Sequence, residues 1–222
     1  MLFRSGGGFD AADNLKMLRQ ALKKFQPGEE PAAIELPDAK DRATIPQPPD
    51  GGLVLYVTWK VLAFEKAAKP GSQEEAFQKS VGVDRLWVRK DEATALAQGK
   101  FPESLKNRMM RYHTPLLGTA KSLQINLKDG QISGAMAVDR EAAPAALRGA
   151  LETKDGKVTR FDLLMKGEGR LQKQWGFLAG LEAIPEGKTA PTALYFSLAD
   201  PNDDLARLPP HRTWRALDAY LK

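Results

Sequence analysis

Residues 147–165 read LRGALETKDGKVTRFDLLM and carry the clearest fold signal of the chain. The D-G pair at 155–156 is typical of a tight turn between two antiparallel strands. On the second of these strands Phe161, Leu163 and Met165 fall at every other position, which places their side chains on one face. The stretch therefore predicts a β-hairpin with one face towards a core.

A second hairpin signal lies upstream of the first. Leu123, Ile125 and Leu127 alternate with polar residues, and another D-G pair follows at 129–130. Residues 132–138 then alternate again. Because two hairpins follow each other along the chain, we predict an antiparallel meander as the spine of a sheet.

Further strands and helices surround these hairpins. We expect strands over residues 53–64, 83–88, 175–181 and 193–198, and helices over 10–25, 72–77, 91–99, 102–113 and 214–221. The nearly continuous apolar run in the first of these strands predicts burial on both of its faces. The fold class is therefore α+β, with an antiparallel β-sheet or partly closed barrel of about 6–8 strands, short helices and an N-terminal amphipathic helix.

The N-terminal part of the chain differs in composition from the rest. Leu15, Leu18 and Leu22 recur at helical spacing with basic residues on the other side, which is typical of an amphipathic helix. Six prolines then follow in a short stretch, too many for a helix interior or a central strand. We predict three parts: an amphipathic helix in 1–26, a Pro-rich linker in 27–50 and a single β-rich α+β domain in 51–222. A protein partner bound through the helix is one expectation.

Composition excludes several classes of site. The chain has 222 residues, with 33 Lys and Arg against 28 Asp and Glu, a formal net charge of +5, and no cysteine. Without cysteine there is no disulfide, no thiolate nucleophile and no Cys-based metal site. The charge is spread over the whole length, so we expect no dedicated nucleic-acid partner.

Membrane and targeting signals are weak. No stretch approaches the roughly 20 apolar residues that cross a bilayer, so we expect no transmembrane segment. Residues 2–8 contain one arginine and a glycine run but lack the apolar core of a signal peptide. This beginning is compatible with a signal peptide upstream of Met1.

Familiar catalytic and cofactor motifs are missing from the sequence. The two histidines, His113 and His211, stand far apart and outside the H-x-x-x-H and H-E-x-x-H spacings of zinc sites. No G-x-S-x-G, G-x-x-x-x-G-K or G-x-G-x-x-G pattern occurs. We therefore expect no metal and no cofactor, and we interpret His113 first as a helix C-terminal residue that favours the helix dipole.

Two polar clusters are candidate binding sites. The first is a basic helix face with an aromatic neighbour at 106–113, and such a face can hold phosphates or an acidic polysaccharide. The second is the polar strand face at 160–162, which is either an exposed cross-strand pair or the lining of a pocket. A solvated surface is the plainer interpretation of both. The candidate binding residues are Arg108, Arg111, His113, Arg160, Asp162 and Trp175.

Several landmarks follow one another from Leu86 onward. They are LWVRKDEATAL at 86–96, RMMRYH at 108–113, DGKVTRFDLL at 155–164, ALYFSLAD at 193–200 and LPP at 208–210. In this order they resemble a group of bacterial proteins, mostly of planctomycete type and mostly exported, that have no assigned activity. The resemblance implies a β-rich fold and a periplasmic or extracellular location, with the cytoplasm as the alternative. The group tends to carry an Asn and an Arg shortly after the histidine, where this chain has Pro115, Leu116 and Leu117, so a site built on that polar run would be incomplete here.

We interpret the chain as a non-catalytic extracytoplasmic binding or structural domain that binds a partner or ligand on the face of a curved sheet. One alternative is an enzyme with a polar site around His113 and Asp162, which requires the helix end to lie over the strand. Another is a binder of anionic polymers through the basic helix at 100–111. If the chain has a polar site, we place it where the helix end at Arg111 and His113 meets the strand with Arg160 and Asp162.

Overall fold

The computed structural model describes seven ranges of the chain. They are residues 11–24, 46–62, 67–79, 81–139, 143–170, 189–211 and 217–221. The chain divides into two units, residues 1–44 and 45–222. Among the described residues, no helix has both the length and the apolar composition that spanning a bilayer requires.

The first unit contains helix α1, Ala11–Lys24. This helix confirms the amphipathic helix expected near the N-terminus, and Leu15, Leu18 and Leu22 along its apolar side are all exposed. Residues 25–45, which cover most of the predicted Pro-rich linker, lie outside the described residues. The boundaries of that linker therefore stay a prediction.

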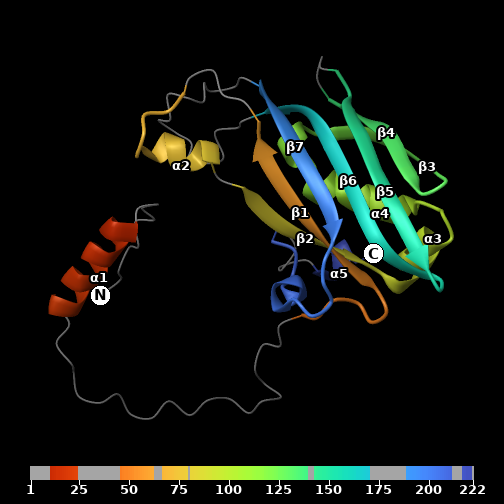
Figure 1. The fold of residues 1–222 in the computed structure, drawn as a ribbon, viewed down its shortest axis with the longest axis horizontal. Helices are drawn as coiled ribbons and strands as arrows, with labels where there is room; N and C mark the ends of the chain where they lie inside the picture. Colours follow the sequence, from red (N-terminus) through yellow and green to blue (C-terminus); the bar gives the residue numbers. More distant parts are fainter. Residues whose placement is uncertain are drawn as a thin grey trace, which may run out of the picture. The chain divides into compact units, whose positions relative to one another are not determined.

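The second unit is built on one antiparallel sheet, in which the described residues form seven strands (Figure 1). The strands are β1 Leu53–Val61, β2 Gly82–Val88, β3 Ala120–Lys128, β4 Gln131–Val138, β5 Ala145–Lys154, β6 Lys157–Arg170 and β7 Thr189–Leu198. Their order across the sheet is β2-β1-β7-β6-β5-β4-β3, so β2 and β3 are the two edges and the sheet does not close. The antiparallel α+β class is confirmed in its open form, and the strand predicted at 175–181 lies outside the described residues.

Both D-G pairs form the hairpin turns that the sequence predicts. Asp129 and Gly130 have φ of 50° and 74°, and Asp155 and Gly156 have φ of 52° and 72°. Two successive left-handed residues define the turn whose twist matches that of paired strands. The two turns fix β3 against β4 and β5 against β6.

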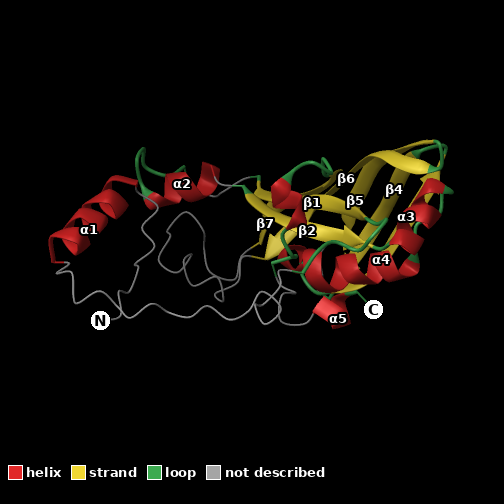
Figure 2. Ribbon diagram, turned by 90° about the horizontal axis from the view of Figure 1, so that it is seen from below, coloured by secondary structure: helices red, strands yellow, loops and turns green. Residues whose placement is uncertain are grey.

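Short helices accompany the sheet. They are α2 Gln73–Lys79, α3 Lys90–Ala97, α4 Glu103–Arg108, the π-helix η2 Met109–His113, the 3-10 turns η3 Pro115–Leu117 and η5 Asp204–Arg207, and α5 Leu217–Tyr220. Figure 2 shows α3, α4 and α5 on one side of the sheet, which we call its inner face. The opposite side is the outer face. The helix predicted at 102–113 is thus α4 continued by η2, where the N–H of Thr114 donates to the carbonyl of Met109 at 3.1 Å.

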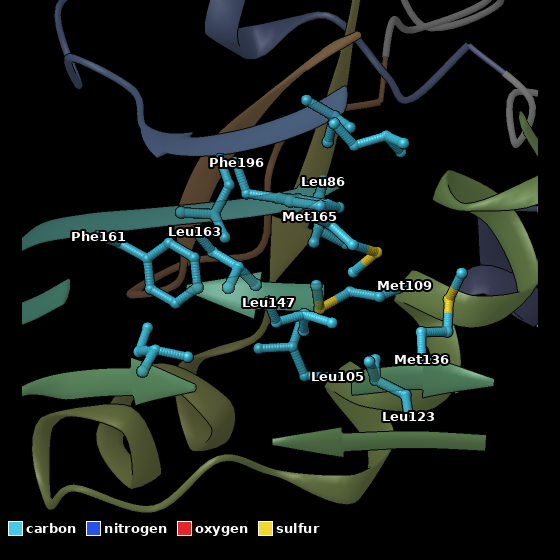
Figure 3. Close-up of a cluster of buried hydrophobic side chains, with 14 of the residues drawn as sticks. Leu86, Leu105, Met109, Leu123, Met136, Leu147, Phe161, Leu163, Met165 and Phe196 are labelled. Carbon is cyan, nitrogen blue, oxygen red and sulfur yellow. The ribbon is translucent and has the colours of Figure 1, made fainter. Parts of the chain in front are cut away.

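The core lies between the inner face and the helices. Alternate residues of β6, among them Phe161, Leu163 and Met165, are fully buried there (Figure 3). Leu105 and Met109 from the helices are buried in the same cluster. The expectation that β1 is buried on both faces is wrong, because only inner-face residues of this strand are buried and its other positions are half-buried. The outer face of β1 is partly covered, because η5 contacts this strand and the Tyr56 hydroxyl donates to Asp203 next to η5.

Candidate functional site

A connected set of polar side chains lies on the outer face of the sheet. Arg160 donates from Nε to Asp162 Oδ2 and from Nη1 to Glu152 Oε1, the latter at 2.8 Å. The hydroxyl of Tyr195 donates to the other oxygen of Asp162. These four residues, Glu152, Arg160, Asp162 and Tyr195, form what we call the outer-face cluster. It confirms that Arg160 and Asp162 lie together.

Strand register assembles this cluster from three neighbouring strands. Glu152 on β5 stands opposite Arg160 on β6, and Leu164 on β6 stands opposite Tyr195 on β7. A register shift between Glu152 and Thr153 places Arg160 opposite the glutamate. The bulge keeps both charged side chains on the outer face.

Hydrogen bonding fixes the protonation of the cluster. The Tyr195 hydroxyl and, after it, the Arg160 guanidinium lower the pKa of Asp162. The same bond to Asp162 raises the pKa of Tyr195. At neutral pH the carboxyl is therefore ionised and the phenol protonated. Neither group has a pKa moved towards neutrality, as a general acid or base would need.

The cluster borders an apolar spot in the middle of the outer face. Leu164 and Tyr195 are exposed by 44% and 38% although they sit on central strands. Their neighbours across the sheet are mostly small or polar. In order from β3 to β2, this row contains Asn126, Ser133, Arg148, Leu164, Tyr195, Thr58 and Val83.

The predicted basic helix face has a different structure from the one expected. Arg108 points into the protein, where its Nη2 donates to the carboxylate of Glu92 and to the carbonyl of Trp87, the latter at 3.3 Å. Arg111 is exposed, with its guanidinium carbon 5.2 Å from the centre of the Tyr112 ring. The expectation of one solvated basic face is therefore wrong for Arg108. Its guanidinium binds the Trp87 carbonyl of edge strand β2 and the buried carboxylate of Glu92.

His113 is also buried, and it belongs to a second polar set. Its Nδ1 lies 3.4 Å from Asp84 Oδ2, and its Nε2 lies 2.9 Å from the hydroxyl of Tyr220. The same hydroxyl accepts the backbone N–H of Trp87 at 3.3 Å. We call Asp84, His113 and Tyr220 the C-terminal clasp, because they join the last helix to the edge strand β2.

The two parts of the predicted site do not meet. Val57, which faces the inner side, pairs with Asp84, so His113 is bound on the inner face of β2. Asp162 lies on the outer face of β6, three strands away in the order β2-β1-β7-β6. At roughly 4.8 Å per strand spacing the lateral separation alone is about 14 Å. The expectation that the helix end lies over Asp162 is wrong, because the polar face of β6 turns away from the helices.

Several residues of these clusters were not recognised from the sequence. Glu92, Asp84 and Tyr220 gave no signal, because each meets its partners through tertiary contacts. The D-G turn at 155–156 predicts that β5 lies beside β6, and Glu152 lies on β5. Among the described residues, no group of three or more His, Asp or Glu side chains is placed to hold a metal ion. Trp175, the remaining candidate, lies outside the described residues.

Comparison with known proteins adds no assignment to this geometry. No family model, no curated protein and no solved structure matches the chain. The two clusters are the polar side-chain sets that a function of this domain can use. Of these, the outer-face cluster is open to solvent, whereas the side chain of His113 in the clasp is only 1% exposed.

The clasp makes the free energy of unfolding depend on pH in the acid range. Burial opposes ionisation of Asp84, but the contact with His113 and the N–H groups of His211 and Arg85 outweigh it and lower the pKa of Asp84 below its ordinary 3.8. A lowered folded-state pKa stabilises the fold above the ordinary pKa, and this contribution is lost as pH falls through the folded-state value. Urea titrations at several pH values are expected to show that Asp84→Asn is less stable than the wild type at pH 6, with the difference shrinking below pH 3.8.

The control for this prediction is Asp129→Asn, at an exposed turn position where Asn is also tolerated. It removes one carboxylate without touching the clasp. A difference for Asp84→Asn that stays constant from pH 6 to acid pH would contradict the role of this carboxylate.

Proposed function

We propose that the chain is a non-catalytic binding domain that holds its partner or ligand on the outer face of the sheet. The observation that supports this proposal is the exposed pair Leu164 and Tyr195 on central strands, where Tyr195 also belongs to the hydrogen-bonded outer-face cluster. Tyrosine is enriched at binding sites because its ring contributes apolar area and its hydroxyl a polar contact.

Preorganisation makes this surface suited to binding. The Tyr195 side chain is already held by its bond to Asp162, and Arg160 is held by two carboxylates. Side chains ordered before binding lose less conformational entropy when the partner arrives. A matching partner has a flat apolar area for Leu164 and Tyr195, with hydrogen-bonding groups around it for the polar rim.

The arrangement gives less support to an enzyme. The deeply buried His113 of the clasp donates or accepts within the protein, and the pKa shifts of Asp162 and Tyr195 point away from neutrality. The hypothesis that the chain binds anionic polymers also loses support, because Arg108 pairs with Glu92 in the interior. Binding on the outer face uses neither His113 nor the buried pair Arg108 and Glu92.

An extracytoplasmic location is a separate proposal, motivated only by the sequence resemblance. It is tested by fractionating cells that express the natural gene with a C-terminal tag. Recovery of the tagged protein in the cytoplasm alone would contradict it.

We expect binding to weaken when the side chains of Leu164 and Tyr195 are removed. The immobilised full chain is incubated with extract and culture fluid of the native cells and with a glycan array, and the retained molecules are identified. The double variant Leu164→Ala/Tyr195→Ala is expected to weaken retention at least about tenfold, as loss of a central binding residue does.

The control is Leu205→Ala, which removes from η5 a leucine that is exposed by 57%, against 44% for Leu164. It is expected to retain the same molecules as the wild type. Equal retention by the double variant would contradict the proposal, and so would a wild type that retains nothing from any of the three sources.

A further inference from the structure

Helix α1 carries two parallel stripes of opposite character. Leu15, Leu18 and Leu22 are exposed by 47%, 56% and 63% at positions i, i+3 and i+7. The basic residues Lys16, Arg19 and Lys23 repeat the same spacing one residue later and are exposed as well. The apolar stripe therefore runs along the helix with a cationic stripe directly beside it.

The charge of this segment is concentrated. Between residues 11 and 24 there are four basic side chains, those of Lys16, Arg19, Lys23 and Lys24, against the single acid Asp13, which gives 4 − 1 = +3. The whole chain has a formal charge of +5. The helix thus combines a local net charge of +3 with three exposed leucines.

A helix of this length needs a surface to pack against. It has 14 residues. Isolated helices shorter than about 12–15 residues are only marginally stable in water, so this helix is close to that limit. Packing its apolar face would supply the missing stability. A suitable surface must accept leucine side chains and at the same time offer negative charge beside them.

We propose that α1 docks on the surface of an anionic phospholipid bilayer, with its leucines in the acyl boundary and its basic stripe at the phosphates. Amphipathic helices with a basic polar face lie in the membrane plane in this way. The long stems of Lys and Arg beside the leucines reach up to the headgroups while their methylenes extend the apolar contact. The inference is independent of the proposed role of the outer face, since none of the residues of α1 belongs to that site.

The test is flotation of the full chain with two kinds of vesicle, pure phosphatidylcholine and phosphatidylcholine with about 30% phosphatidylglycerol. The wild type is expected to float with the anionic vesicles only. Binding should fall steeply between about 50 and about 500 mM NaCl, because the charges are solvent-exposed and screened by salt. Leu18→Glu is expected to abolish binding by placing a charge in the apolar stripe.

Two matched double variants separate the helix charge from the overall charge. Lys16→Gln/Lys23→Gln is expected to weaken vesicle affinity about 25-fold, at about fivefold for each cation removed near the membrane. Lys121→Gln/Lys154→Gln removes two exposed lysines from strands of the other unit and should leave the affinity within about twofold.

Three outcomes would overturn the inference. The first is a wild type that binds anionic vesicles no better than neutral ones. The second is equal weakening by the two double variants, which would assign binding to the net charge of the chain. The third is retention of an acidic protein through the leucine stripe without any vesicle binding, which would make α1 a protein-docking helix.

Discussion

Replacing Glu92 with alanine is expected to lower the free energy of unfolding by about 3–5 kcal/mol, the usual cost of removing one partner of a buried ion pair. The side chains of Glu92 and Arg108 are exposed by only 1% and 5%. The glutamate also accepts the hydroxyl of Ser104 at 2.5 Å and the backbone N–H of Arg89 at 2.9 Å. Without it, the guanidinium of Arg108 stays buried and loses the carboxylate that it contacts among the described residues.

Urea denaturation followed by circular dichroism measures this loss. The matched control is Glu103→Ala, whose carboxylate is 69% exposed and pairs with Lys106, and it should cost at most about 1 kcal/mol. The double variant Glu92→Leu/Arg108→Met should recover much of the stability, because a well-packed apolar pair can replace a buried ion pair. It also supplies a folded reference if Glu92→Ala does not fold. A loss for Glu92→Ala as small as that for Glu103→Ala would contradict the importance of the buried pair.

Replacing Tyr220 with alanine is expected to cost about 3–5 kcal/mol, as for other fully buried aromatic residues. The centre of its ring lies 5.1 Å from the ring centre of Tyr112 and 5.8 Å from that of His113. The guanidinium carbon of Arg108 lies 5.5 Å from the ring centre of Tyr220. Burial raises the pKa of Tyr220, so its hydroxyl stays protonated and keeps both of its hydrogen bonds at neutral pH.

Tyr220→Phe separates the hydroxyl from the ring. It should cost about 1–3 kcal/mol, because it leaves the buried N–H of Trp87 and Nε2 of His113 without this partner. Asp218→Ala, an exposed position in the same short helix, should change stability by no more than about 0.5 kcal/mol. If Tyr220→Ala behaves like Asp218→Ala in urea denaturation, the last helix does not stabilise the edge of the sheet.

The hairpins could be predicted because their signals are local. A D-G pair adopts the left-handed turn at low cost, and the alternation of Phe161, Leu163 and Met165 assigns one face of β6 to the core. The same alternation correctly grouped Arg160 with Asp162 on the opposite face. It could not show that Tyr195 joins them, because β7 reaches β6 after residues 171–188 and its pairing depends on the whole sheet.

The helix at 102–113 shows where local reasoning fails. In a regular α-helix two residues five positions apart, such as Arg108 and His113, point about 140° apart. The i→i+5 bonding of η2 brings such residues closer to one side of the helix. Both side chains therefore turn inwards, and the basic face expected from the residue types does not form.

The fold class, the two hairpins, the buried face of β6 and the amphipathic character of α1 all follow from local sequence patterns. These properties depend on turn chemistry and on the periodicity of neighbouring residues. Long-range packing, in contrast, buries Arg108 beside Glu92 and His113 beside Asp84 and Tyr220. Arg160 and Asp162 lie on the opposite face of the sheet. A charge is buried only where other segments supply its partners, because an unpaired buried charge is costly. The spacing of residues along the chain does not show which distant segments come together.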